Sequence, residues 1–227
     1  MRLFRFRPQI GPNDVGVALH LLRCAFGERT PTVDHVDAVD FSLPLLEFAR
    51  SLPNGNRPNI RWIHGAAETA PLNPPYALAT AGSSLHWMDW YIVLPRVKAA
   101  LVPGSYLAIF DERAKPLPWD AAVGQLIPQY STNKDFRPYK LLDELTQRNL
   151  FKPEGRFSAG PMPFSQRVDE YIEAMHARNG FSRDRMTPNA AADFDRQFRS
   201  LVEPHCPDGI VNIEVFTEVT YGLPAPA

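Results

Sequence analysis

The sequence predicts an α/β fold in which helices cover both faces of a mostly parallel β-sheet. Short apolar segments rich in β-branched residues alternate with segments whose apolar residues recur every three or four positions. This alternation is typical of a parallel sheet. After residue 111 the alternation stops, and amphipathic segments precede a final β-rich stretch. We therefore expect a sheet, a helical insertion and a last antiparallel strand.

The first half of the chain supplies the alternating elements. A helix is expected over 14–27, where Val15, Leu19 and Leu22 share a face and Gly27 ends the pattern. The handedness of strand–helix–strand units then places a ligand crevice at the carboxyl ends of the strands. The elements that follow in turn are strand 35–42, helix 43–52, strand 59–65, strand 76–82, helix 90–101 and strand 105–111.

Local chemistry supports these elements. Ser42 is a candidate N-cap of the helix at 43–52, and Pro44 falls in its first turn, where proline is tolerated. The segment 59–65 alternates in the manner of a strand, and 76–82 is short and apolar.

Residues 112–208 are interpreted as helical insertions that form a lid, rather than as an independent domain. The alternating segment 209–222 would return to the sheet as the last strand. The chain 1–227 is accordingly expected to be one domain, with 11–111 as its cofactor-binding half. Three amphipathic helices are expected in the lid, at 139–151, 165–178 and 189–205.

Composition excludes several classes of protein. The chain has 227 residues, 44% of them hydrophobic, which suits a sizeable core in one domain. A net charge of −1 with mixed signs argues against nucleic acid or an anionic membrane as partner. Two cysteines cannot build a disulfide scaffold or a four-thiolate zinc site, and no ligand-spaced cluster indicates a metal. Without a membrane-length apolar run or a signal peptide, a cytoplasmic protein is expected.

Two positions could carry chemistry. Asp40 ends the first convincing strand, where a carboxylate can accept hydrogen bonds from a ribose diol. It could equally stabilise the positive end of the dipole of the next helix. His86 and Trp87 follow the strand at 76–82, where aromatic packing at a helix start is the alternative to a catalytic role. Position alone leaves both questions open.

Four segments, in their order and spacing, resemble the class I S-adenosylmethionine-dependent methyltransferases. They are similar to the type 11 methyltransferase-domain group, which includes trans-aconitate methyltransferase-like proteins. The resemblance is specific over residues 33–111. It implies a Rossmann-like fold, S-adenosyl-L-methionine as cofactor and methyl transfer to a small-molecule acceptor. The segments are "VDAVDFSLPLLEFAR", "IRWIHGAAETAPL", "YALATAGSSLHWMD" and "ALVPGSYLAIF".

The resemblance implies a set of cofactor contacts. Asp40 would hold the ribose hydroxyls, and Phe41 would lie against the adenine ring. Ala67 and Glu68 would sit by the adenine edge. The residues expected beside the methionine part are Ala81 and Gly82.

The resemblance also implies an acceptor side. His86 and Trp87 would line the boundary between cofactor and substrate. His86 is a candidate general base, because an imidazole titrates near neutral pH, and a packing or orienting role is the alternative. The helix around Tyr171 and His176 would help to cover the acceptor pocket.

The sequence departs from the family pattern at two places. Ala66 stands where the family usually has an acid, so a carboxylate acceptor for the adenine amino group would be missing. In the opening loop Gly11 remains, and Asn13, which tolerates positive φ, takes a second glycine's place. Arg5 and Arg7 would place charge in a doubly buried strand, so we expect that residues 1–10 do not form a proper first strand, as in an altered or shortened version of a longer parent.

Two competing functions follow. A non-catalytic, methyltransferase-like protein would have lost cofactor binding and would act through partner interaction, which the altered opening loop favours. A nicotinamide dehydrogenase would also use an acid after the second strand, but its glycine fingerprint is absent from the sequence.

Overall fold

The computed structural model describes residues 1–7, 32–135, 137 and 139–224. They belong to two compact units. The first unit comprises Met1–Asp111, Lys140–Phe157 and Glu218–Ala227, and the second comprises Glu112–Tyr139 and Ser158–Thr217. The helix expected over 14–27 lies outside the described residues.

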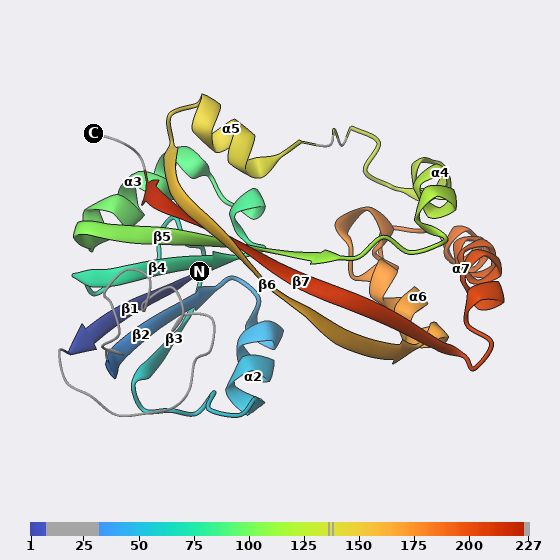
Figure 1. Ribbon diagram of the computed structural model, residues 1–227, viewed down its shortest axis with the longest axis horizontal. Helices are drawn as coiled ribbons and strands as arrows, with labels where there is room; N and C mark the ends of the chain where they lie inside the picture. Colours follow the sequence, from blue (N-terminus) through green and yellow to red (C-terminus); the bar gives the residue numbers. More distant parts are fainter. Residues whose placement is uncertain (8–31, 136, 138, 225–227) are drawn as a thin grey trace. The chain divides into compact units, whose positions relative to one another are not determined.

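The described residues form a seven-stranded sheet with the order β3-β2-β1-β4-β5-β7-β6 (Figure 1). The β2–β3 and β4–β5 pairs are parallel, and the arrow of β7 runs against those of β5 and β6 in Figure 1. The order 3-2-1-4-5 is that of doubly wound α/β proteins, so the predicted Rossmann-like class with a last antiparallel strand is confirmed. The strands are β1 Arg2–Arg7, β2 Thr32–Asp40, β3 Ile60–His64, β4 Tyr76–Gly82, β5 Leu101–Ala114, β6 Phe151–Arg167 and β7 Ile210–Pro224.

We expected that residues 1–10 would not form a proper first strand, and residues 1–7 of this segment are described. Arg2–Arg7 form strand β1. It pairs with β2 from Arg2 to Arg7 and with β4 from Arg2 to Phe4, antiparallel in both cases. The residues that argued against a central strand, Arg5 and Arg7, lie beyond the β4 ladder and pair with β2 alone. Just after the β4 ladder stops, the register of the β1–β2 ladder shifts between Arg5 and Phe6. Only Arg2, Leu3 and Phe4 are therefore paired on both sides, so β1 is not a fully paired central strand.

The direction of β1 brings Met1 to the carboxyl ends of β2 and β4. The Met1 amino group donates to the carbonyl of Val39 at 3.0 Å, and the Val39 N–H donates to the Met1 carbonyl at 2.9 Å. The Met1 side chain is buried. At the other end of β1, Arg7 pairs with Thr32.

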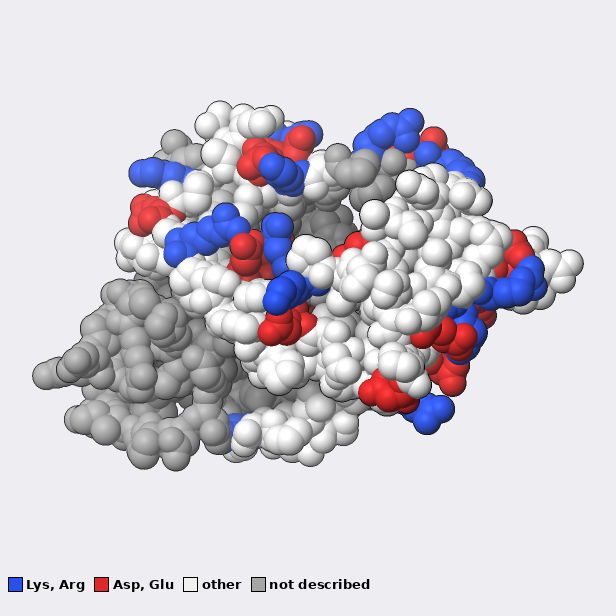
Figure 2. Space-filling view, turned by 45° about the vertical axis from the view of Figure 1, so that its right-hand side comes forward, with Lys and Arg blue, Asp and Glu red and all other residues white. Residues whose placement is uncertain are grey.

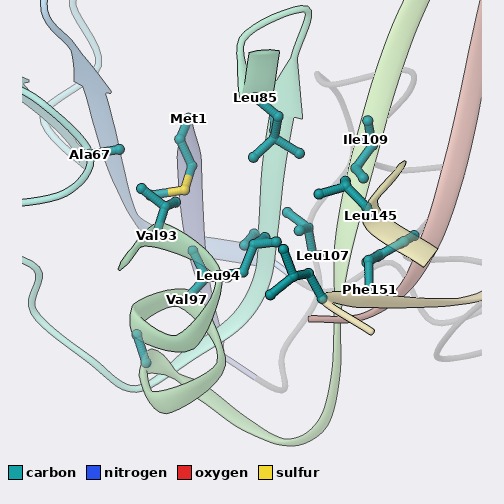
Figure 3. Close-up of a cluster of buried hydrophobic side chains, with 14 of the residues drawn as sticks. Met1, Ala67, Leu85, Val93, Leu94, Val97, Leu107, Ile109, Leu145 and Phe151 are labelled. Atoms are coloured by element: carbon teal, nitrogen blue, oxygen red, sulfur yellow. The ribbon is translucent and has the colours of Figure 1, made fainter. Parts of the chain in front are cut away.

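Helix α3 covers one face of the sheet in the first unit. Its N-cap is Asp89, whose carboxylate accepts the Tyr91 N–H at 2.9 Å. The buried face of the helix packs with side chains of β4, β5, α5 and the start of β6 (Figure 3). Burial of such aliphatic side chains contributes about 1.5–3 kcal/mol each. The cluster includes Met1, Ala79, Leu85, Val93, Leu94, Val97, Leu107, Leu145 and Phe151.

The helices begin and end close to their predicted bounds, with one exception. The helix expected over 139–151 ends at Gln147, because Asn149 takes a left-handed φ of 56° and β6 starts at Phe151. The sequence did not indicate β6, which contains three prolines and two glycines. It is the last strand in the sheet order, where proline does not interrupt a central ladder. The helical elements are α2 Leu43–Ser51, η1 Leu85–Trp87, α3 Trp90–Ala100, α4 Asp120–Tyr130, α5 Leu141–Gln147, α6 Val168–His176, η2 Asn179–Phe181, α7 Pro188–Val202 and η3 Glu203–His205.

The second unit has its own core, built around α7. Thr187 caps this helix through a 3.2 Å bond from the Ala190 N–H. Phe194 and Phe198 are fully buried and stacked, with ring centroids 5.5 Å apart. Cys206 is buried in the same core, which raises the pKa of its thiol. The core also takes in residues of α4, α6 and the first part of β7.

A buried carboxylate joins three segments of the first unit. Asp37, in the middle of β2, is fully buried and accepts from Arg61 of β3 through two bonds of 2.8 and 2.6 Å. It also accepts from the Tyr76 hydroxyl and contacts the His35 imidazole at 2.6 Å. Arg61 in turn donates to the carbonyl of Pro71 at 2.7 Å. The network therefore ties β2, β3 and the loop before β4 together.

These contacts set the ionisation of Asp37. Burial is the largest single influence and acts to raise its pKa, but the hydrogen bonds from Arg61, Tyr76 and His35 together outweigh it. The pKa of Asp37 lies below its ordinary value as a result, and burial with the bond to Asp37 raises the pKa of Tyr76 to about 12.

We predict that Asp37→Asn lowers the free energy of unfolding by about 2–4 kcal/mol, because it removes the negative charge that pairs with Arg61. Arg61 is 41% exposed, so water compensates its charge only in part. Because the pKa of Asp37 is lower in the folded state than in the unfolded chain, its contribution is present above about pH 4 and is lost at lower pH. Denaturant unfolding of both proteins between pH 3 and pH 7 measures this. Asp143→Asn, at an exposed position in α5, is the control. A stability difference that does not narrow in acid contradicts the account.

Candidate functional site

The carboxyl ends of the strands form the candidate site. Arg2 pairs with Ala38 on one side and with Thr80 on the other, so these two residues are level. Asp40 and Gly82 each lie two residues further along and are level too. Because β1 lies between β2 and β4, the two ends are about 10 Å apart, or twice the usual strand spacing. Doubly wound proteins bind their ligands at such a reversal of strand order, next to the carboxyl ends of the strands.

Asp40 lies where the sequence placed it, at the last position of β2. Its Oδ1 accepts the N–H of Ser42 at 2.8 Å, which holds the carboxylate at the start of α2. Its Oδ2 has no hydrogen-bond partner among the described residues. The next residue, Phe41, is 67% exposed, and its carbonyl contacts the His64 ring at 3.1 Å. The pair thus presents a carboxylate oxygen beside an uncovered aromatic ring.

The turn after β3 carries Ala67 and Glu68. Its backbone is closed by bonds from the N–H groups of Thr69 and Ala70 to the carbonyl of Ala66. Ala67 is buried. Glu68 accepts the N–H of Asp89 at 2.8 Å through Oε1 and so joins this turn to the N-cap of α3. The sequence did not predict this bond between the Glu68 carboxylate and the backbone of Asp89.

The end of β4 and the turn that follows it differ in the space around each residue and in backbone conformation. Ala81 is buried, whereas a Cβ added to Gly82 would meet nothing within 4 Å. Ser83 has a left-handed φ of 43° and donates its N–H to Phe110 of β5 at 3.0 Å. Ser84 follows, and its buried hydroxyl has no hydrogen-bond partner among the described residues. Gly82 therefore borders free space at the end of the strand.

His86 and Trp87 lie in η1, immediately after this turn. Their rings are tilted with centroids 4.9 Å apart, and Trp87 is 56% exposed. Desolvation lowers the pKa of His86 and the negative charge of Asp111 opposes the shift, with desolvation the stronger of the two. The net shift favours the neutral imidazole, which can accept a proton, over the imidazolium.

Tyr171 and His176 lie in the second unit. Tyr171 accepts the indole N–H of Trp119 at 3.2 Å. His176 is buried, and its two ring nitrogens contact the carbonyl of Phe181 and Oδ1 of Asp195, each at 2.6 Å. Both residues are held by their own unit, and their role towards an acceptor stays a prediction.

Gly11 and Asn13, expected at the methionine end of the cofactor, lie outside the described residues. The described residues that flank this segment, Arg7 and Thr32, pair at the end of β2 opposite Asp40. Asp111, whose charge acts on His86, was not identified from the sequence. A signal was present, because Asp111 ends the segment "LVPGSYLAIFD", which runs beside the strand before His86.

The described residues were also compared with what a membrane span, a metal site or a charged surface would require. None of the described helices is long and apolar enough to cross a bilayer, and the described side chains form no group of three His, Cys, Asp or Glu residues suited to a metal ion. Basic and acidic side chains are interspersed on the face seen in Figure 2, in keeping with the mixed charges of the sequence.

Comparison with solved structures bears on the fold of the chain. The chain is similar to a "Putative Type II Methyltransferase" from Anaeromyxobacter dehalogenans, with a TM-score of 0.52 and 21% identity over 84% of this chain and 82% of that one. Its fold is thus that of the class I methyltransferases, as the four segments predicted. No protein-family model matches the chain, and no curated protein matches it.

Two further structures resemble the chain less closely. One is a "putative methyltransferase" from Bacillus halodurans C-125, with a TM-score of 0.48 and 14% identity over 84% of this chain and 83% of that one. The other is an S-adenosylmethionine-dependent methyltransferase from Thiobacillus denitrificans in complex with S-adenosyl-L-homocysteine. Its TM-score is 0.42, with 14% identity over 83% of this chain and 75% of that one.

We predict that Glu68→Ala lowers the free energy of unfolding by about 1 kcal/mol, because the N–H of Asp89 loses its carboxylate partner. The midpoint of thermal unfolding falls by roughly 2–4 °C. Glu68→Gln keeps an oxygen at the same position and is expected to lose less than half as much. Differential scanning calorimetry measures both, and equal losses in the two variants would show that this bond does not stabilise α3.

Proposed function

We propose that the chain transfers a methyl group from S-adenosyl-L-methionine to a small-molecule acceptor. The observation that carries the proposal is the environment of Asp40. In a methyltransferase fold, this carboxylate ends the second strand, keeps one oxygen without a described partner and adjoins the exposed ring of Phe41. A carboxylate so placed can accept both hydroxyls of a ribose, and the ring can cover an adenine.

The described residues fit the adenosine half of this cofactor. The Asp40 oxygen that has no described partner and the exposed Phe41 suit ribose and base, while the open space at Gly82 among the described residues leaves room for the chain that follows the ribose. Glu68 lies next to the expected adenine edge with one oxygen engaged by Asp89. When bound, the cofactor supplies an electrophilic methyl group on a sulfonium.

The chain's own residues would orient the reaction and handle a proton. Methyl displacement requires alignment of acceptor and methyl group and exclusion of water more than acid–base chemistry. The indole of Trp87 offers a flat apolar surface to the acceptor. The neutral imidazole of His86, a few residues from Gly82, can accept a proton from it. These roles need no residue of the second unit.

One observation favours the alternative, a methyltransferase-like protein that binds no cofactor and acts through a partner. Strand β1 is antiparallel, so Met1 lies between Val39 and Ala81 at the carboxyl edge. A glycine loop would follow a parallel first strand at this edge. Binding of cofactor distinguishes the two functions, because only the enzyme requires it.

We expect S-adenosyl-L-homocysteine and S-adenosyl-L-methionine to bind the protein in isothermal titration calorimetry, and Asp40→Ala to weaken binding about 10- to 100-fold. The loss corresponds to charge-assisted bonds worth about 1.5–3 kcal/mol. Asp143→Ala, an exposed acid on α5, serves as the control and should bind as the wild type does. Absence of binding by the wild type at millimolar ligand would instead support the non-catalytic alternative.

A further inference from the structure

Phe41 lies in the segment that joins β2 to α2, and both peptide groups that flank it are bonded. The carbonyl of Asp40 accepts the N–H of Gly65 at 2.9 Å. The carbonyl of Phe41 contacts Nε2 of His64 at 3.1 Å. Because a carbonyl oxygen can only accept, Nε2 carries the proton and donates it. The backbone on either side of Phe41 is therefore held to the end of β3.

The peptide group between Phe41 and Ser42 connects His64 with the carboxylate of Asp40. Its carbonyl accepts from the imidazole of His64, and its N–H donates to Oδ1 of Asp40 at 2.8 Å. A peptide group is planar and rigid, so a rotation of it changes both bonds at once. The bond at the carbonyl also polarises the N–H and strengthens its donation. His64 thus bears on the position of the Asp40 carboxylate through one peptide group.

The ring of Phe41 depends on the same bonds. Phe41 is 67% exposed, so packing contributes little to the orientation of its ring. The direction in which the ring leaves the backbone is set by the two bonded peptide groups instead. Fixing an exposed phenyl group brings the fold little apolar burial. A binding surface, in contrast, gains from contact groups that are held in place before the ligand arrives.

We propose that His64 is a positioning residue for the adenosine half of the cofactor. The inference rests on the proposed methyl transfer and deepens it, because it names the side chain that holds both the carboxylate of Asp40 and the ring of Phe41. His64 lies opposite Asp40 in the parallel β2–β3 ladder, which brings its imidazole to the start of α2. His64 needs no contact with the ligand itself.

Hydrogen exchange of the Ser42 amide tests the first step in the protein without ligand. This N–H is bonded to Asp40, and His64→Ala removes the bond that holds its peptide group, so exchange should become at least about three times faster. His64→Gln, whose side-chain N–H can donate to the same carbonyl, should restore most of the protection. His205→Ala, at an exposed position in η3, is the control and should leave the rate unchanged. Equal rates in the wild type and in His64→Ala overturn the proposal.

Isothermal titration calorimetry with S-adenosyl-L-homocysteine and with adenosine tests the second step. His64→Ala should weaken the binding of both ligands by roughly fivefold, the effect of losing one ordinary hydrogen bond, and His64→Gln should bind within about twofold of the wild type. A role in folding alone would lower the midpoint of thermal unfolding and leave both affinities unchanged at temperatures well below that midpoint. Unchanged affinities, or a loss that His64→Gln does not restore, overturn the proposal.

A double variant shows whether His64 acts through Asp40. In the Asp40→Ala protein the carboxylate is gone, so adding His64→Ala should weaken binding by only about twofold, the part that acts through Phe41. The full effect of His64→Ala in that background would contradict the proposal. Absence of binding by the wild type refutes the proposed methyl transfer and this inference together, whereas unchanged affinities in His64→Ala refute this inference alone.

Discussion

The hydrogen bonds of β1 to β2 on one side and to β4 on the other join the two parallel halves of the sheet. Within the described residues, the β2–β3 pair and the β4–β5 pair share no other strand. The register of β1 also sets the level at which the two halves end. Because Ala38 and Thr80 are both opposite Arg2, β2 and β4 end level at the same edge of the sheet. The geometry of the candidate site follows from this one strand.

The sequence predicted β2, β3, β4, α2 and α3 of the first unit well, since each has a local cause. Strand β4 has the predicted bounds, and α2 and α3 begin where Ser42 and Asp89 precede an apolar periodic run. The positions of Asp40 and Gly82 at strand ends follow from the same local patterns. These features depend on propensity and alternation, which a single sequence contains.

Features that depend on pairing between distant segments could not be predicted in the same way. The charges of Arg5 and Arg7 argued against a central strand, but the ladder to β4 stops at Phe4 and leaves that half paired on one side. Likewise, β6 carries prolines and glycines that mark a loop when read locally, and only its place at the end of the sheet makes them tolerable.

Asp37 and Asp40 show how position within one strand decides the use of the same residue type. Asp37 lies inside β2, fully buried, and its carboxylate is surrounded by Arg61, Tyr76 and His35. No oxygen of that group is left for a ligand, and its charge stabilises the fold. Asp40 lies at the strand end, where one oxygen accepts a backbone N–H and the other has no hydrogen-bond partner among the described residues. A strand interior forces an acid to be satisfied by the protein, whereas a carboxyl end allows an acid to be shared with a ligand.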